Sequence, residues 1–155
     1  QSALFRDLRG VDLWAGPFCN PANPLALQTL AEMGFAGAFV SPELGSEAFL
    51  ELPRISPLPL GMVLTGIWPL CLSRVISDTI DTRHPFTSPR GEEAWARRYD
   101  DNIWIFPNWQ LDLSDQRQVL DKAGYQWLAH LQEPVPKTVK LKSRQGLWNW
   151  NIGLK

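Results

Sequence analysis

Three short apolar runs at nearly regular spacing constrain the fold of this chain more than any other feature. They begin near residues 11, 36 and 59, about 25 and 23 residues apart. Each run is continuously apolar, which is typical of strands that are covered on both faces. Each interval has room for a helix and two loops, so the rhythm predicts a parallel βαβαβ unit with right-handed crossovers.

Helix signals stand in both intervals. Asn23, just before a proline, is a good N-cap, and Gly34 suits the left-handed residue that often ends a helix. Ser46 can cap a second helix that runs through Leu52, and we expect Pro53 to stop it. The expected strands lie at 11–15, 36–40 and 60–65.

The second half of the chain has another pattern. Residues 77–92 are rich in Ser, Thr, Asp, Pro and Arg and predict a long loop. Two apolar stretches, 94–99 and 102–106, flank Asp100-Asp101 and predict an antiparallel hairpin. A helix and a final strand are expected after it, at 114–122 and 125–131.

These elements predict one α/β domain in two parts, a βαβαβ part over 10–76 and a hairpin-helix-strand extension over 77–155. The extension ends in a tail, residues 137–155, with five basic side chains and no acidic one. Such a tail can bind RNA through phosphate contacts and stacking. Alternatively it is a solvated strand that Trp148 and Trp150 anchor by packing back onto the protein.

Composition excludes several specialised classes. Of the 155 residues 45% are apolar and the formal net charge is -1, which argues against a dedicated nucleic-acid-binding protein. No apolar run approaches the roughly 20 residues that a membrane-spanning helix needs, so we expect no membrane span. Cys19 and Cys71 are too few for a disulfide scaffold and are interpreted as reduced thiols of a cytoplasmic protein.

Candidate functional residues follow from the parallel strands, because functional groups gather at the carboxyl ends of such strands. We expect the three loops there to lie side by side. Glu43, after the second strand, can act as a general acid, base or cation ligand, or can stabilise the amides of the next helix. The expected substrate-binding residues come from the other two loops and are Asn20, Asn23, Trp68 and Arg74.

Other reactive side chains have simpler interpretations. Cys19 could be a nucleophile, but the sequence places no histidine beside it. His84 in the long loop is a base or, more simply, a solvated side chain, and His130 near the end of the last strand is expected to be structural. Arg74 can grip a carboxylate or a phosphate, or pair with Glu43. No metal site is expected.

Four segments carry a resemblance to a known family. Residues 19–23 (CNPAN), 41–44 (SPEL) and 69–73 (PLCLS), together with 149–154 (NWNIGL), resemble the U-32 peptidase family, the collagenase-like proteases. The resemblance covers most of residues 10–154. It implies a TIM-barrel-like catalytic region, of which this chain would be a partial barrel from the carboxyl-terminal part, with the amino-terminal half of the protein missing.

The resemblance implies two enzyme functions. Some members of the family are collagen-degrading proteases, and others support oxygen-independent hydroxylation of RNA or of ubiquinone precursors, some with an iron-sulfur cluster on four cysteines. Val75 and Ile76 stand here where such relatives have a cysteine, and two cysteines cannot supply four thiolates. No cofactor is therefore expected in this segment, while a cluster in the full-length protein stays open.

Three hypotheses result. The chain is a domain of a collagenase-like peptidase with a polypeptide substrate, part of a hydroxylation factor with an RNA or ubiquinone-precursor substrate, or a non-catalytic interaction module. An incomplete barrel also leaves strand edges with unpaired amides, so we expect the chain to form a homodimer through these edges, to rearrange or to cover them.

Overall fold

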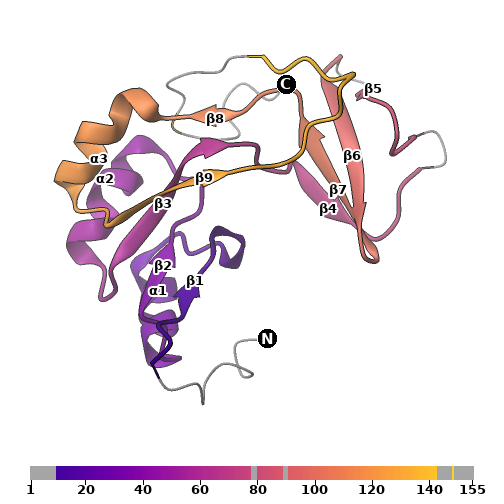
Figure 1. Cartoon of the computed structure of the whole chain (residues 1–155). Coiled ribbons are helices and arrows are strands. Elements are labelled where there is room, and N and C mark those ends of the chain that lie inside the picture. The colour runs from indigo at the N-terminus through magenta and orange to yellow at the C-terminus, as the bar shows by residue number, and fades with distance from the viewer. Residues whose placement is uncertain (1–9, 78–79, 89–90, 143–147, 149–155) are drawn as a thin grey trace.

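The computed structural model describes residues 10–77, 80–88, 91–142 and 148, and two β-sheets organise them (Figure 1). The first sheet contains β1 (Trp14–Ala15), β2 (Gly37–Phe39), β3 (Leu60–Gly66), β8 (Leu111–Asp112) and β9 (Trp127–Leu131). The second contains β4 (Cys71–Ser73), β5 (Phe86–Thr87), β6 (Glu93–Tyr99) and β7 (Asn102–Pro107). The helical segments are η2 (Pro17–Cys19), α1 (Pro24–Glu32), α2 (Ser46–Ile55), η3 (Ser114–Gln116) and α3 (Arg117–Ala123).

The first sheet is built on parallel strands in chain order. β1 pairs with β2, β2 with β3 and β3 with β9, all in parallel. β9 follows one edge of β3, so β2 and the antiparallel β8 share the other edge, where Thr65 pairs with Asp112 and Gly66 with Leu111. The predicted α/β class and parallel βαβαβ unit are confirmed. The structure adds that the final strand, β9, joins this same sheet.

The helices pack against the first sheet through one hydrophobic core. Leu27 of α1, Phe49 of α2 and Leu120 of α3 are all buried there, together with Met62 of β3. Trp148 packs onto the same core, with its ring centroid 5.9 Å from that of Phe49, which confirms the packing predicted for this tryptophan. Among the described residues, no helix is long and apolar enough to cross a membrane. Of the predicted tail, Arg144, Trp150 and Lys155 lie outside the described residues.

Three aromatic rings form a second cluster on the first sheet, which we call the aromatic face. The ring centroid of Trp14 lies 5.8 Å from that of Phe39 and 6.3 Å from that of Trp127. A Cβ atom at Gly37 would come within 2.5 Å of the Trp14 ring, and one at Gly61 within 2.6 Å of the Phe39 ring. The two glycines therefore let the rings lie directly on the strands. Trp127 remains 59% exposed.

The second helix does not end where the sequence predicts. α2 has Gly45 rather than Ser46 as its N-cap, and it continues through Pro53. A proline in a helix leaves the carbonyl four residues earlier without its amide donor. That carbonyl belongs to Phe49, and the hydroxyl of Tyr125 donates to it at 2.8 Å. A side chain from the segment just before β9 thus replaces the missing donor, and the helix tolerates the proline.

We expect Tyr125→Phe to lower the free energy of unfolding by about 1 kcal/mol, because the buried Phe49 carbonyl loses its donor. In a Pro53→Ala background the same change should cost clearly less, since the new amide at position 53 can donate to that carbonyl. A double-mutant cycle measured by urea unfolding checks this coupling. An equal cost of Tyr125→Phe in both backgrounds would contradict it.

The second sheet confirms the predicted hairpin and adds two strands. β6 and β7 pair antiparallel around Asp100, whose φ of 50° is left-handed, as a tight turn requires. β7 also pairs with β4, and β6 with β5, so the order is β4-β7-β6-β5. β5 lies in the segment expected to be a loop. Trp95 and Phe106 are the buried centre of a second hydrophobic core under this sheet.

Candidate functional site

The loops after β1, β2 and β3 lie against one another at the carboxyl ends of these strands. The amide of Ser41, after β2, donates to the carbonyl of Pro21, after β1, at 3.2 Å. The ring of Phe18 in η2 stacks on that of Trp68, after β3, with centroids 4.3 Å apart and an angle of 13° between planes. The structure therefore brings the three strand-end loops together.

The candidate residues of the first two loops hold the backbone of these loops in its conformation. Asn20 is the left-handed residue that ends η2, with φ of 52°, and its side chain is exposed. Asn23 caps α1, and its Oδ1 accepts the amide of Ala26 at 2.9 Å. Glu43 is exposed, and its amide donates to the hydroxyl of Ser41 at 3.2 Å. These contacts fix where the loops run.

Trp68 and Arg74, the candidates of the third loop, lie in very different surroundings. Trp68 is 6% exposed and belongs to the first core, and the ring of Phe18 stacks on it. Arg74 follows β4 directly and is exposed on the second sheet. Glu43 follows β2 of the first sheet, so these two charged residues come from different sheets.

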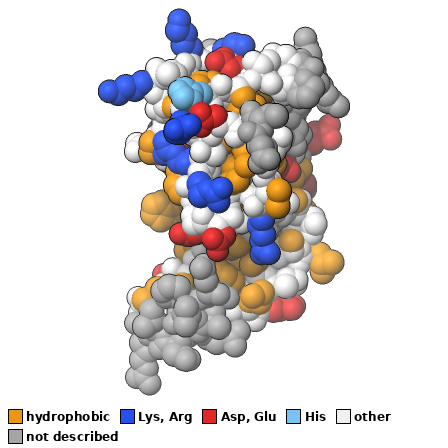
Figure 2. Space-filling view, turned by 90° about the vertical axis from the view of Figure 1, so that its right-hand side faces the viewer, with side chains coloured by type: hydrophobic (Ala, Val, Ile, Leu, Met, Phe, Trp, Pro, Cys, Tyr) orange, Lys and Arg blue, Asp and Glu red, His pale blue; other side chains and the backbone are white. Residues whose placement is uncertain are grey.

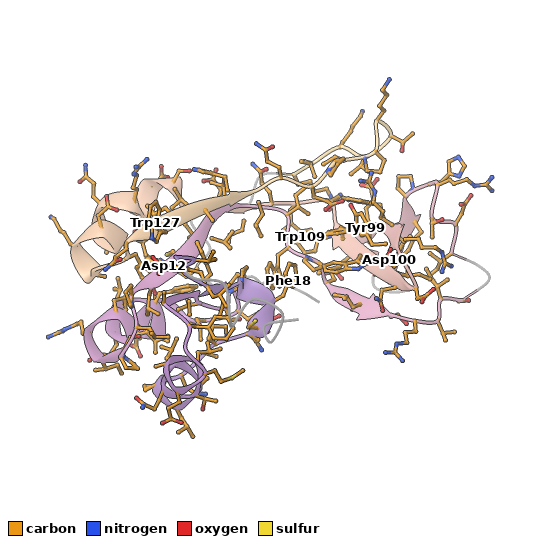
Figure 3. All side chains as sticks on the ribbon, turned by 60° about the horizontal axis from the view of Figure 1, so that its bottom comes forward. Asp12, Phe18, Tyr99, Asp100, Trp109 and Trp127 are labelled. Atoms are coloured by element: carbon orange, nitrogen blue, oxygen red, sulfur yellow. The ribbon has the colours of Figure 1, made fainter. Side chains whose placement is uncertain are left out.

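A cavity of about 250 Å³ lies where the two sheets meet, and we call it the inter-sheet cavity. Its walls come from η2, from the ends of β3 and β9, and from the hairpin β6–β7. Aromatic rings dominate the lining, and Glu133 is the acidic side chain among the lining residues. Figure 3 shows Phe18 reaching from the first sheet toward the second, where Tyr99 stands. A concave, mostly apolar cavity with a few polar groups is the usual form of a ligand site.

Three of the lining rings meet at nearly right angles. The Phe18 ring lies 5.1 Å from that of Trp104 with an angle of 84°, and the Tyr99 ring lies 6.0 Å from it with an angle of 89°. Phe18 is 54% exposed and Tyr99 is 39% exposed. Large apolar side chains left open to water around a cavity indicate a surface that buries them on binding.

A hydrogen-bonded network joins the two sheets at the edge of the inter-sheet cavity. The hydroxyl of Tyr99 and the guanidinium of Arg97, at 3.3 Å, both donate to Oε1 of Glu133. The guanidinium also lies over the rings of Trp95 and Tyr99, 5.7 and 5.9 Å from their centroids. Burial and the hydrogen bond to Glu133 raise the pKa of Tyr99, so its hydroxyl stays protonated and remains a donor.

A hydroxyl and an imidazole are paired at the carboxyl ends of β3 and β9, outside the lining of the inter-sheet cavity. Thr65 Oγ1 and His130 Nδ1 are 2.6 Å apart across β3 and β9. Ile67 and Leu131, which line the inter-sheet cavity, follow them closely in the chain. The sequence predicts a structural role for His130, and only the pairing of β3 with β9 shows that a hydroxyl stands beside its ring. A hydroxyl that is hydrogen-bonded to an imidazole is a pairing that a nucleophile and a general base can use.

The outer surface of the second sheet is rich in charge. Figure 2 shows Lys and Arg side chains around a histidine on this face, with acidic side chains among and below them. A shallow hollow of about 570 Å³ there is lined in part by Asp81, Arg83 and Arg98. Hydrogen bonds from Arg83 and His84 hold the pKa of Asp81 well below its usual value, so the candidate base His84 is already paired with a carboxylate.

The potential metal ligands of the described residues are His, Cys, Asp and Glu side chains. Among those residues, no three such side chains are grouped to hold a metal ion. Cys19 and Cys71 are free and exposed. The sequence has these two cysteines alone, so its residues do not fit a cluster that needs four thiolates.

Comparisons of this chain with protein-family models, curated proteins and solved structures found no match. Function is therefore inferred from the chemistry of the inter-sheet cavity and the strand ends. The sequence patterns do not single out Phe18, Tyr99, Trp104 or Glu133. The one signal that could have found them is the clustering of aromatic residues in the hairpin, beside a phenylalanine in a strand-end loop.

Proposed function

We propose that this chain is the carboxyl-terminal part of a U-32-type barrel protein and forms the wall that binds a polypeptide substrate. Four parallel strands in chain order, with helices packed on a shared core, support the barrel origin, because a (βα)8 barrel repeats this arrangement. The position of the inter-sheet cavity carries the proposal. It opens at the carboxyl ends of β3 and β9, where barrel enzymes hold their substrates.

Peptide cleavage by the full-length protein is the activity that we propose for this site. Thr65, hydrogen-bonded to His130 where β3 and β9 end, is the proposed nucleophile, and Glu43 remains the proposed acid from the neighbouring loop. Asn20 and Asn23 shape the loop that carries Phe18. Exposed aromatic rings and a cavity suited to one large side chain favour an extended polypeptide as the substrate.

Fluorescence anisotropy with labelled casein or gelatin peptides tests the binding step on this chain. Trp104→Ala should weaken binding about ten-fold or more, because the Trp104 ring lines the cavity and contacts the rings of both Phe18 and Tyr99. Trp127→Ala, on the aromatic face, is the matched control and should leave binding unchanged. Equal affinity of all three proteins would remove the cavity as the binding site.

Cleavage assays on the full-length protein then test the chemistry. Thr65→Val and Glu43→Ala should each abolish cleavage if these groups act in it. Asn23→Asp keeps the oxygen that caps α1, whereas Asn23→Ala removes it, so the pair separates a binding role from a capping role. Full activity of Thr65→Val would exclude this hydroxyl as the nucleophile.

RNA is the second candidate substrate, as part of a hydroxylation factor. Arg83 and Arg98 line the hollow on the outer face of the second sheet, where basic side chains gather (Figure 2). Arginine contacts to phosphates make RNA binding salt-dependent. Salt-sensitive binding of single-stranded RNA that is lost in Arg83→Glu and Arg98→Glu, with no binding of peptides, would favour this candidate.

A non-catalytic interaction role remains the third proposal, and it includes a homodimer through the edge of β9. Trp127 lies on this strand and is 59% exposed, and an open edge offers amides to a second copy. A monomer in light scattering at high protein concentration would count against the dimer.

A further inference from the structure

We infer that the inter-sheet cavity recognises an organic cation, and specifically the guanidinium or ammonium group of an arginine or lysine side chain in the bound polypeptide. The inference deepens the proposed function, on which it rests, because it names the kind of residue that the polypeptide presents to the cavity. Three observations carry it: the arrangement of the rings, the charge of the lining, and an arginine of this same chain whose guanidinium is held by aromatic rings and a carboxylate.

The rings form a partial aromatic cage. Phe18 and Tyr99 stand at 84° and 89° to Trp104, so the rings present π faces in more than one direction around the cavity. Cations are attracted to such faces, and cages of aromatic rings are a recurrent way to bind ammonium groups. The rings are also held in place, because Phe18 stacks on Trp68 and Trp104 lies nearly parallel to Phe106, 6.3 Å away. A preorganised cage loses little entropy when it binds.

Among the residues that line the cavity the charged group is a carboxylate, and Arg97, its ion-pair partner, lies outside the lining. Glu133 is the charged side chain among the residues around the cavity, and it is 17% exposed. Both hydrogen bonds that it accepts from described residues end on Oε1, which leaves Oε2 available to a ligand. A neutral apolar side chain would cover this carboxylate without offering it a donor, and an anion would be repelled by it. A cation satisfies the carboxylate and the rings together.

The protein contains an internal example of the same recognition. The guanidinium of Arg97 lies over the rings of Trp95 and Tyr99 and donates to Glu133 at 3.3 Å. Arg97 is not among the residues that line the cavity. A ligand guanidinium entering the cavity would contact Tyr99 and Trp104 and approach the remaining oxygen of Glu133. Glu133 would then lie between two cations, one internal and one from the ligand.

Calorimetric titration of this chain with small probes tests the inference. Nα-acetyl-arginine amide and Nα-acetyl-lysine amide should bind, and the arginine probe should bind about ten-fold or more tightly than Nα-acetyl-citrulline amide, its neutral isostere. Glu133→Gln preserves the shape of the side chain and should weaken the arginine probe about five-fold or more, with little effect on citrulline. Glu47→Gln, at an exposed acid in the first turn of α2, is the matched control and should change neither affinity.

A second pair of variants separates the rings from the fold. Trp104→Phe keeps an aromatic face and should retain most of the preference for arginine over citrulline, whereas Trp104→Leu should remove it. Circular dichroism and the urea midpoint of both variants show whether the second sheet still folds. If Trp104→Leu folds like Trp104→Phe and keeps the same preference, the aromatic cage is excluded.

The outcomes distinguish this inference from the proposed function. Equal binding of the arginine and citrulline probes overturns the inference that the cavity recognises a cation. The proposal of a polypeptide substrate still stands if labelled peptides without basic residues bind and Trp104→Ala weakens that binding. Tighter binding of adenosine or cytidine monophosphate than of the arginine probe also overturns the inference of a cation and points to a nucleobase. If neither the probes nor any labelled peptide binds, the inference and the proposed function fail together.

Discussion

Gly66→Ala should lower the free energy of unfolding by about 2–5 kcal/mol, because strain and overlap act at the same position. Gly66 ends β3 with φ of +145°, a conformation that residues with a side chain rarely adopt. A Cβ atom there would lie 2.6 Å from both the carbonyl oxygen and the Cβ of Leu131. Leu131 cannot withdraw easily, since it is the register partner of Gly66 in the pairing of β9 with β3.

Two other glycines provide controls for this prediction. Gly16 has open space around its missing side chain, so Gly16→Ala should change stability by about 0.5 kcal/mol or less. Gly91 has φ of +80° and equally open space, so Gly91→Ala isolates the conformational cost of about 1–2 kcal/mol. Urea unfolding at equilibrium measures all three. A Gly66→Ala protein as stable as Gly16→Ala would mean that β3 and β9 do not approach as closely as described.

Trp95→Ala should lower the free energy of unfolding by about 3–5 kcal/mol, the usual cost of deleting a buried aromatic side chain. Trp95 is 1% exposed, and its ring stacks on that of Phe106 with centroids 4.5 Å apart. Its Nε1 donates to the carbonyl of Pro107 at 3.2 Å, so the change also leaves this buried acceptor without a donor. The guanidinium of Arg97 would lose one of its two aromatic contacts as well.

Trp127→Ala is the matched control, because the same atoms are removed from a side chain that is 59% exposed. It should cost about 1 kcal/mol or less. Trp95 belongs to the second core and not to the first, so hydrogen exchange should locate the loss of protection mainly in β6 and β7. Equal destabilisation by the two changes, or a loss of protection centred on β3, would contradict the description of two separate cores.

Much of the fold could be predicted because its signals are local. Asn23 caps α1 and Gly124 ends α3 in a left-handed conformation with φ of 108°, as their residue types indicate. The hairpin follows from two apolar stretches around Asp100. β5 and β8 have two residues each, which is too short for any periodicity to be visible. The end of α2 was missed for another reason, since the donor that compensates Pro53 comes from Tyr125, far away in the sequence.

Of the two walls of the inter-sheet cavity, only the one formed by the strand-end loops of the first sheet could be predicted. The rule that loops meet at the carboxyl ends of parallel strands located the loop of Asn20 and Asn23 beside that of Trp68, and the stacking of Phe18 on Trp68 agrees with it. The opposite wall depends on how the second sheet packs against the first. No local pattern specifies that Trp104 of β7 meets Phe18 of η2, so the cavity could not be found from the sequence.

The pairing of Gly66 with Leu111 has a consequence for how such a protein can change. The chain leaves the first sheet at Gly66, builds the whole second sheet, and re-enters the first sheet at Leu111, directly beside its point of departure. The second sheet is therefore an insertion with adjacent ends, and an insertion of this kind can be shortened, lengthened or exchanged without rerouting the framework. One wall of the inter-sheet cavity can thus diverge freely while the other is held by the parallel strands, which makes ligand choice separable from the stability of the fold.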